Sequence, residues 1–117
     1  MDCPKVTLEN FPNECALLQS EGLHGQVLHQ DTHILDANQA ASDITGYSID
    51  ELIGSKSWKL YAPESLITVQ ENMQTHGDVD YTVTAMSKSG EKFDVRLKVL
   101  QLEFDGEAVR LAAFKRL

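Results

Sequence analysis

The chain has 117 residues, 42% of them hydrophobic and 24% charged, which fits one globular domain with a single core. Its formal net charge of −8 disfavours direct binding to nucleic acids and to anionic membrane surfaces. There is no apolar run of roughly 20 residues, no secretory signal and no Cys-x-x-Cys pair. We therefore expect a cytoplasmic domain with free thiols and no membrane contact of its own.

Residues 1–22 are predicted to form an amphipathic helix that precedes a main domain at 23–117. Apolar residues recur at intervals of three or four, and Gly22 marks the end of the pattern. Because such a short helix must bury its apolar face, it is expected to pack on its own sheet or on that of a partner. The residues of this face are Leu8, Phe11, Cys15 and Leu18.

The next segment predicts a β-hairpin around residues 30–32. His29 and His33 flank its turn. A metal ion bridged by these two histidines would lack a third ligand nearby in the sequence, so they are interpreted as solvated turn residues.

From Ala37 the pattern changes to that of a helix. Gly46 is well placed to end this helix in a left-handed conformation. Ser48 and Glu51 have the spacing of a capping box, which predicts a second short helix that stops at Gly54.

A further helix is predicted to begin at Pro63 and to end near His76 and Gly77. The remaining sequence predicts antiparallel strands joined by turns at 88–91 and 105–106. Between residues 93 and 104 the alternation of apolar residues changes phase, which predicts a bulge or bend near Val99 and Leu100. Helices clustered between groups of strands indicate an α+β fold with an antiparallel sheet.

Several of these segments together resemble the PAS family of sensory domains. The resemblance extends from about Leu23 to the end of the chain and rests on combined spacing rather than on any single motif. The residues that carry it are Asn38, Gly46, Tyr47, Ser48, Glu51 and Gly54, followed by segments 62–65, 88–93 and 105–106. Each has a structural role: Asn38 is expected to tie strand to helix, and Tyr47 to pack against the sheet.

The resemblance implies a five-stranded antiparallel sheet of order 2-1-5-4-3, with helices on one face and the N-terminal helix as an addition. It also implies a pocket between the sheet and the long helix. Trp58 is expected either at the mouth of this pocket or as a plug in the core. The candidate pocket residues are Ile44, Trp58, Leu66, Met73, Val83, Val95, Leu97 and Leu111.

The same resemblance bears on two cofactors, haem and flavin. Haem-binding relatives place an axial histidine on or near the long helix, where His76 lies, although a histidine at a helix end is also an ordinary stabilising feature. The covalent flavin adduct of some relatives needs a cysteine after the middle helices, and residues 55–60 contain none. We therefore expect no haem, no metal and no flavin adduct, and the small ligand is unidentified.

The resemblance implies a signal-sensing domain, not an enzyme, within a larger protein of the histidine kinase or cyclic-dinucleotide enzyme type. It would bind a small ligand or transmit a signal by rearrangement of a homodimer, with Leu8, Phe11, Cys15 and Leu18 as dimer candidates. The alternatives are a ligand-free dimerisation or protein-interaction module, a haem sensor and a small α+β enzyme. At the C-terminus, Arg116 stands where many family members carry an acidic residue of the signal-transfer motif.

Overall fold

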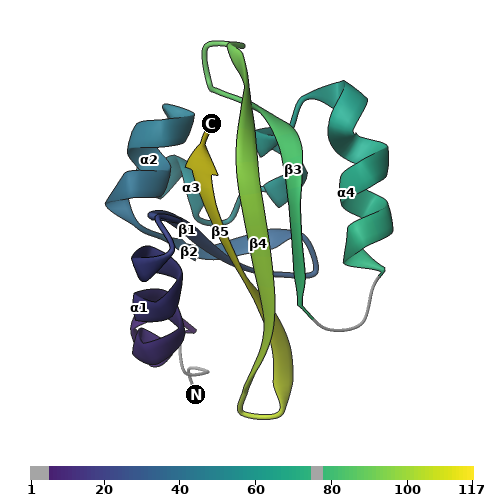
Figure 1. Cartoon of the computed structure of the whole chain (residues 1–117). Helices are drawn as coiled ribbons and strands as arrows, with labels where there is room; N and C mark the ends of the chain where they lie inside the picture. The colour runs from purple at the N-terminus through teal and green to yellow at the C-terminus, as the bar shows by residue number, and fades with distance from the viewer. Residues whose placement is uncertain (1–5, 75–77) are drawn as a thin grey trace.

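The computed structural model describes residues 6–74 and 78–117 and contains one five-stranded antiparallel sheet. The strand order is β2-β1-β5-β4-β3, as predicted (Figure 1). The strands are β1 (Gly25–Gln30), β2 (His33–Ala37), β3 (Val79–Met86), β4 (Lys92–Phe104) and β5 (Glu107–Arg116). The α-helices are α1 (Pro12–Ser20), α2 (Gln39–Thr45), α3 (Ile49–Leu52) and α4 (Leu66–Met73), and the 3-10 turns are η1 (Leu8–Asn10), η2 (Ser57–Leu60) and η3 (Pro63–Ser65).

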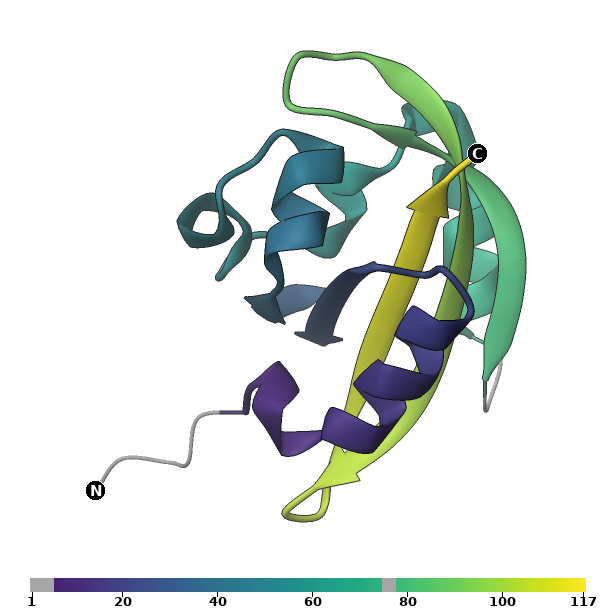
Figure 2. The ribbon, with the colours of Figure 1, turned by 60° about the vertical axis from the view of Figure 1, so that its left-hand side comes forward.

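Two hydrophobic clusters cover the two faces of the sheet. The inner face packs against the helices between β2 and β3, through side chains such as Ala41 of α2, Leu52 of α3 and Val69 of α4. The outer face packs against the N-terminal segment through Phe11 and Leu18. Figures 1 and 2 show α1 apart from the group formed by α2 and α3. The N-terminal helix therefore covers the second face of its own sheet.

The turns and caps follow from local sequence. The side chain of Asn38 accepts a hydrogen bond from the Ala41 amide at the start of α2, and Gly46 ends that helix with φ of 80°. Ser48 and Glu51 form the predicted capping box, with hydrogen bonds of 3.0 and 3.1 Å. These caps of α2 and α3 are confirmed.

Strand β4 has no bulge at Val99 and Leu100, which was one of the two forms that the phase change predicted. It pairs with β5 in one unbroken register from Val95 to Phe104. The change in apolar phase has another cause: up to Val99 the apolar side chains pack on the inner cluster, and from Leu100 onward they pack on the outer cluster. The covered face of the strand changes while the strand continues. The register shift of the sheet lies instead between β1 and β2, at Leu28 and His29.

The helix that starts at Pro63 begins as the 3-10 turn η3 and continues as α4. α4 ends at Met73, and the predicted end at His76 and Gly77 lies outside the described residues. In the described part of the chain, no helix is long and apolar enough to cross a membrane.

Candidate functional site

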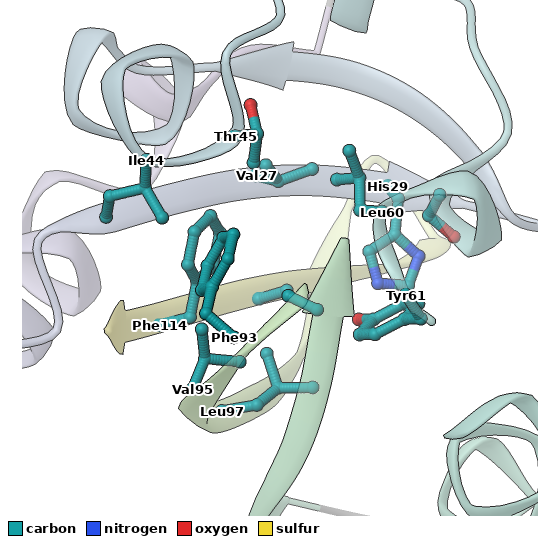
Figure 3. A pocket seen from close by; sticks show the side chains of 13 residues that line it. Val27, His29, Ile44, Thr45, Leu60, Tyr61, Phe93, Val95, Leu97 and Phe114 are labelled. Carbon is teal, nitrogen blue, oxygen red and sulfur yellow. The ribbon is translucent and has the colours of Figure 1, made fainter. Parts of the chain in front are cut away.

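A small, mainly apolar cavity lies between the inner face of the sheet and the middle helices (Figure 3). Its volume is about 30 Å³, enough for one or two water molecules and far below the roughly 300–1,000 Å³ of a drug-sized ligand site. We call it the inner cavity. Its lining residues are Val27, His29, Ile44, Thr45, Ser57, Leu60, Tyr61, Ala85, Phe93, Val95, Leu97, Ala112 and Phe114.

Strand alternation directs these side chains inward. Along β1, Gly25, Val27 and His29 share the inner face, because side chains two apart on a strand point the same way. A glycine is required at 25, since a Cβ there would lie 2.8 Å from Cε2 of Phe114. The close approach of β1 to the Phe114 ring thus closes one end of the cavity, and the rings of His29 and Tyr61 lie toward the other (Figure 3).

Among the polar residues that line the inner cavity, His29 stands out because its ring has an unpartnered nitrogen. The residue is 5% exposed, and Nδ1 has no hydrogen-bond partner among the described residues. Burial, reinforced by the positive charge of Arg110, lowers the pKa of His29 to about 4, so the imidazole is neutral near pH 7. A neutral imidazole offers one donor and one acceptor. An unsatisfied nitrogen in a mainly apolar cavity is a potential contact for a polar ligand atom or for water.

The interpretation of His29 as a solvated turn residue is therefore wrong. Strand β1 runs to Gln30, and the turn is confined to Asp31 and Thr32, both with positive φ. His29 thus belongs to the strand and points inward, whereas His33 at the start of β2 is exposed. The two imidazoles do not share a metal site, and no group of three or more candidate metal ligands occurs within 6–74 and 78–117.

Two further hollows adjoin His29. The side hollow, of about 20 Å³, is lined by His29, Ser57, Trp58, Tyr61, Val69, Asn72, Met73, Val79, Tyr81, Val99 and Arg110. The outer hollow, of about 200 Å³, is lined by His29, Asp31, Met73, Gln101, Ala108 and Arg110. His29 borders all three spaces, and Arg110 borders the two hollows.

Arg110 lies directly opposite His29 in the pairing of β1 with β5. Its side chain is half-buried, and Nη2 donates a hydrogen bond of 2.6 Å to the carbonyl oxygen of Met73 at the end of α4. Burial raises the pKa of the Tyr61 hydroxyl, and it also raises that of Tyr81, against the opposing effect of Arg110. Both phenols therefore stay protonated near neutral pH.

The structure distributes the sequence-predicted pocket residues over several places. Ile44, Val95 and Leu97 line the inner cavity, and Trp58 and Met73 line the side hollow. Trp58 is 51% exposed, which excludes a plug in the core. Val83 is buried in the inner cluster and Leu66 is half-buried, and neither lines these three spaces.

The prediction that Leu111 lines the pocket is wrong, because Leu111 packs in the outer cluster on the opposite face of the sheet. The alternation of β5 places Arg110, Ala112 and Phe114 inward and the residues between them outward. Arg110 was not among the predicted pocket residues, although it shares the inward face of β5 with Ala112 and Phe114. Its phase relative to Phe114 was the signal that would have found it.

The four dimer candidates also need correction. Phe11 and Leu18 are buried against the outer face of the sheet, and Leu8 and Cys15 are partly buried beside them. Their side chains are therefore used inside the chain, with Phe11 packed edge to face on Phe104 at 6.2 Å. The exposed large apolar side chain of α1 is Leu17 instead.

Comparisons with known proteins agree with this architecture. The sequence pattern of the PAS domain family matches residues 24–115, so the chain belongs to the PAS family of sensory modules. A search of curated proteins found no match.

Solved PAS structures share the fold at low sequence identity. A PAS domain of a two-component sensor histidine kinase is 16% identical, with a TM-score of 0.70 over 94% of this chain and 99% of that one. A PAS domain in complex with ethanol, from a LuxR-family transcriptional regulator of Burkholderia thailandensis, is 24% identical, with a TM-score of 0.68 over 80% and 88%. A light-oxygen-voltage domain studied with a flavin analogue is 20% identical, with a TM-score of 0.73 over 90% and 84%.

Proposed function

We propose that this PAS domain senses a small molecule at the inner cavity and its adjoining hollows, and regulates an output domain in a larger signalling protein. The observation that carries the proposal is the unpartnered Nδ1 of buried His29. A buried polar nitrogen without a partner costs about 1–3 kcal/mol, and a ligand or water that bonds to it recovers part of that cost. The site would therefore favour a ligand with a polar atom next to an apolar part.

The mechanism is differential affinity. A ligand that fits one packing of the helices on the sheet stabilises that packing and shifts the population toward it. β5 joins the cavity to the C-terminus, because Phe114 lines the cavity and Arg116 ends the strand. An output domain that follows would then sense the change. A histidine kinase, a transcriptional regulator and a cyclic-dinucleotide enzyme are the output classes that fit, and the domain itself acts without catalysis in the cytoplasm.

The second candidate is a ligand-free dimerisation or protein-interaction module. The small volume of the inner cavity favours it, because a core that is nearly filled leaves little room for a ligand. In that case a homodimer would form through a surface other than the four covered side chains of the N-terminal segment. Leu17 is an exposed large apolar side chain on α1, the helix that carries Cys15 and Leu18, and it is available to such a surface.

Haem and flavin do not fit the residues present. Either group would need a volume many times larger than the inner cavity, and the rings of Phe93 and Phe114 fill the space between helix and sheet. The described free thiol, Cys15, packs on the outer face, away from the cavity. His76 lies outside the described residues and gives no support to a haem site. We therefore propose a sensor without a resident cofactor.

The test uses the purified domain, first by absorption spectroscopy and native mass spectrometry. No Soret or flavin band is expected. A titration with ethanol and 1-butanol, followed by amide NMR, should then shift signals near Val27, His29 and Ala112. The same shifts should be lost in the cavity-filling variant Ala112→Val. A domain that binds neither alcohol and gives a dimer mass would support the interaction module instead.

A further inference from the structure

Arg110 is a half-buried cation without an acidic partner in the described part of the chain. The ion pairs formed there use Lys88, Lys92, Arg96, Lys98 and Arg116. Arg110 instead donates to a neutral carbonyl, that of Met73, at 2.6 Å. A guanidinium has five donors arranged in a fork, and it is the side chain best suited to bind a carboxylate through two parallel hydrogen bonds.

The outer hollow gives such an anion a place to bind. Its volume is about 200 Å³, and Arg110 and His29 both line it. The one acidic side chain among its described lining residues is Asp31, which is exposed and forms no ion pair with Arg110 within 4 Å. Together with the net charge of −8, Asp31 disfavours a doubly charged anion such as phosphate more than a singly charged one.

The spaces on the other side of His29 suit an apolar chain. The inner cavity is lined mostly by aliphatic and aromatic side chains, including Val95, Leu97 and Phe114. His29 stands between this apolar space and the outer hollow, with its unpartnered Nδ1 available to donate to an oxygen in the tautomer protonated at that nitrogen. A ligand that satisfies both parts has an anionic head and a short hydrocarbon tail.

We propose that the ligand is a short-chain monocarboxylate whose carboxylate binds Arg110 beside His29, and whose tail enters the inner cavity. This inference rests on the proposed sensory function and names its ligand class. Entry of the tail requires the inner cavity to widen from about 30 Å³, so binding changes the packing of helices on the sheet. Recognition and signalling would then be the same event.

The experiment compares sodium butyrate with 1-butanol, butylamine and sodium phosphate as probes of the purified domain. Trp58, the one tryptophan of the chain, lines the side hollow and reports binding through its fluorescence. Butyrate is expected to bind at least about tenfold more tightly than butanol, because the carboxylate gains charge-assisted hydrogen bonds. Propionate is expected to bind about fourfold more weakly than butyrate, the effect of one buried methylene.

The variant Arg110→Gln should weaken butyrate binding about tenfold or more, and should reduce the preference for butyrate over butanol. Arg110→Lys keeps the charge without the fork, and is expected to lose less affinity; it also serves if the glutamine variant does not fold. Arg96→Gln is the matched control, because Arg96 pairs with Asp80 at 2.7 Å on the outer face and has the same charge. It should bind butyrate as the wild type does.

The outcomes separate the inference from the proposed function. Equal affinity for butyrate and butanol, or no loss in Arg110→Gln, overturns the carboxylate proposal while the sensory function stands. Tighter binding of butylamine overturns it in the same way. Phosphate that binds as tightly as butyrate overturns the apolar part of the site. Failure of butyrate and both neutral and cationic analogues to bind overturns the small-molecule sensor itself.

Discussion

The guanidinium carbon of Arg116 lies 4.4 Å from the centroid of the Phe93 ring, and that ring lines the inner cavity. Arg116 also forms an ion pair with Glu91 at 3.2 Å. The amide of the next residue, Leu117, donates to the carbonyl oxygen of Asp94 at 2.9 Å. The C-terminal end of the chain is thus fastened to a residue of the cavity wall. Where many PAS domains carry an acidic residue, this chain uses a cation packed on an aromatic ring.

Arg116→Gln is expected to loosen the end of β5. A cation over an aromatic ring at an exposed site contributes about 0.5–1 kcal/mol, so amide exchange at Leu117 should rise about twofold to fivefold. Hydrogen exchange followed by NMR measures this. Lys115→Gln is the control, because Lys115 points to the opposite face of the strand from Arg116 and thus away from Phe93. Unchanged exchange at Leu117 would remove the proposed link between cavity and terminus.

His29 should make the stability of the domain depend on pH. Its pKa of about 4 in the folded chain is below its ordinary value of 6.5, so the unfolded chain binds the proton more readily between these values. The free energy of unfolding therefore does not change above pH 6.5 on account of His29. It decreases as the pH falls from 6.5 toward 4, by at most on the order of 3 kcal/mol. The groups around the imidazole are Arg110 of β5, Tyr61 after η2, Tyr81 of β3 and Asp31.

The variant His29→Phe keeps a ring of similar size and removes the titration. Urea unfolding at pH 7, 5.5 and 4.5 should therefore give a flatter pH profile in this variant than in the wild type. Carboxylates with lowered pKa, such as Glu51, Glu64 and Asp80, lose their contribution at lower pH and are common to both proteins. His33→Gln, which removes an exposed imidazole, should keep the wild-type profile. Identical profiles in all three proteins would contradict the burial of a neutral His29.

Sequence reasoning succeeded where neighbouring residues alone determine the conformation. Gly46 ends α2 because the last turn needs a residue with positive φ, which depends on the local backbone alone. Ser48 and Glu51 cap α3 through hydrogen bonds between residues three apart in the sequence. The strand order was predicted from the resemblance to the PAS family, because these local motifs occur together in proteins that share one sheet topology. These features need no knowledge of which distant segments meet.

The site depends on contacts between residues far apart in the sequence, and the sequence alone did not predict these contacts. His29 has an ordinary turn sequence beside it, and only the register of β1 with β5 places it opposite Arg110. Phe11 and Leu18 looked available to a partner because nothing in the sequence indicates which sheet face they cover. The phase change in β4 suggested a bulge or a bend for the same reason, since the sequence of a strand does not show which other segments cover it.

Gly25→Ala is expected to disturb the cavity wall. The new Cβ would lie 2.8 Å from the Phe114 ring and 3.1 Å from Cδ1 of Ile44, closer than atoms pack in a core. The cost should be about 1–3 kcal/mol of unfolding free energy, measured in urea. The double variant Gly25→Ala, Phe114→Leu should cost less than the sum of the two single changes, because the smaller side chain relieves the contact. Strict additivity would mean that Gly25 is there for another reason.

Asn38 ties the start of β1 to the start of α2, beside the site. Its Oδ1 accepts from the amides of Gln26 at 3.0 Å and Ala41 at 2.9 Å, and its Nδ2 donates to the carbonyl oxygen of His24 at 2.8 Å. Asn38→Ala removes all three hydrogen bonds and should lower the free energy of unfolding by about 3 kcal/mol, since the cap of α2 alone contributes about 0.5–2 kcal/mol.

The variant Asn38→Asp separates the hydrogen bonds that Asn38 accepts through Oδ1 from the one that it donates through Nδ2. It keeps the acceptor for both amides but turns a second oxygen toward the His24 carbonyl, so its stability should lie between those of the wild type and Asn38→Ala. Asp43→Ala, an exposed change in the same helix, is the control and should stay within about 0.5 kcal/mol of the wild type. If Asn38→Asp matched the wild type, the amide hydrogen bond to His24 would contribute nothing. The junction of β1 and α2 would then be held by the cap and by the Gln26 amide alone.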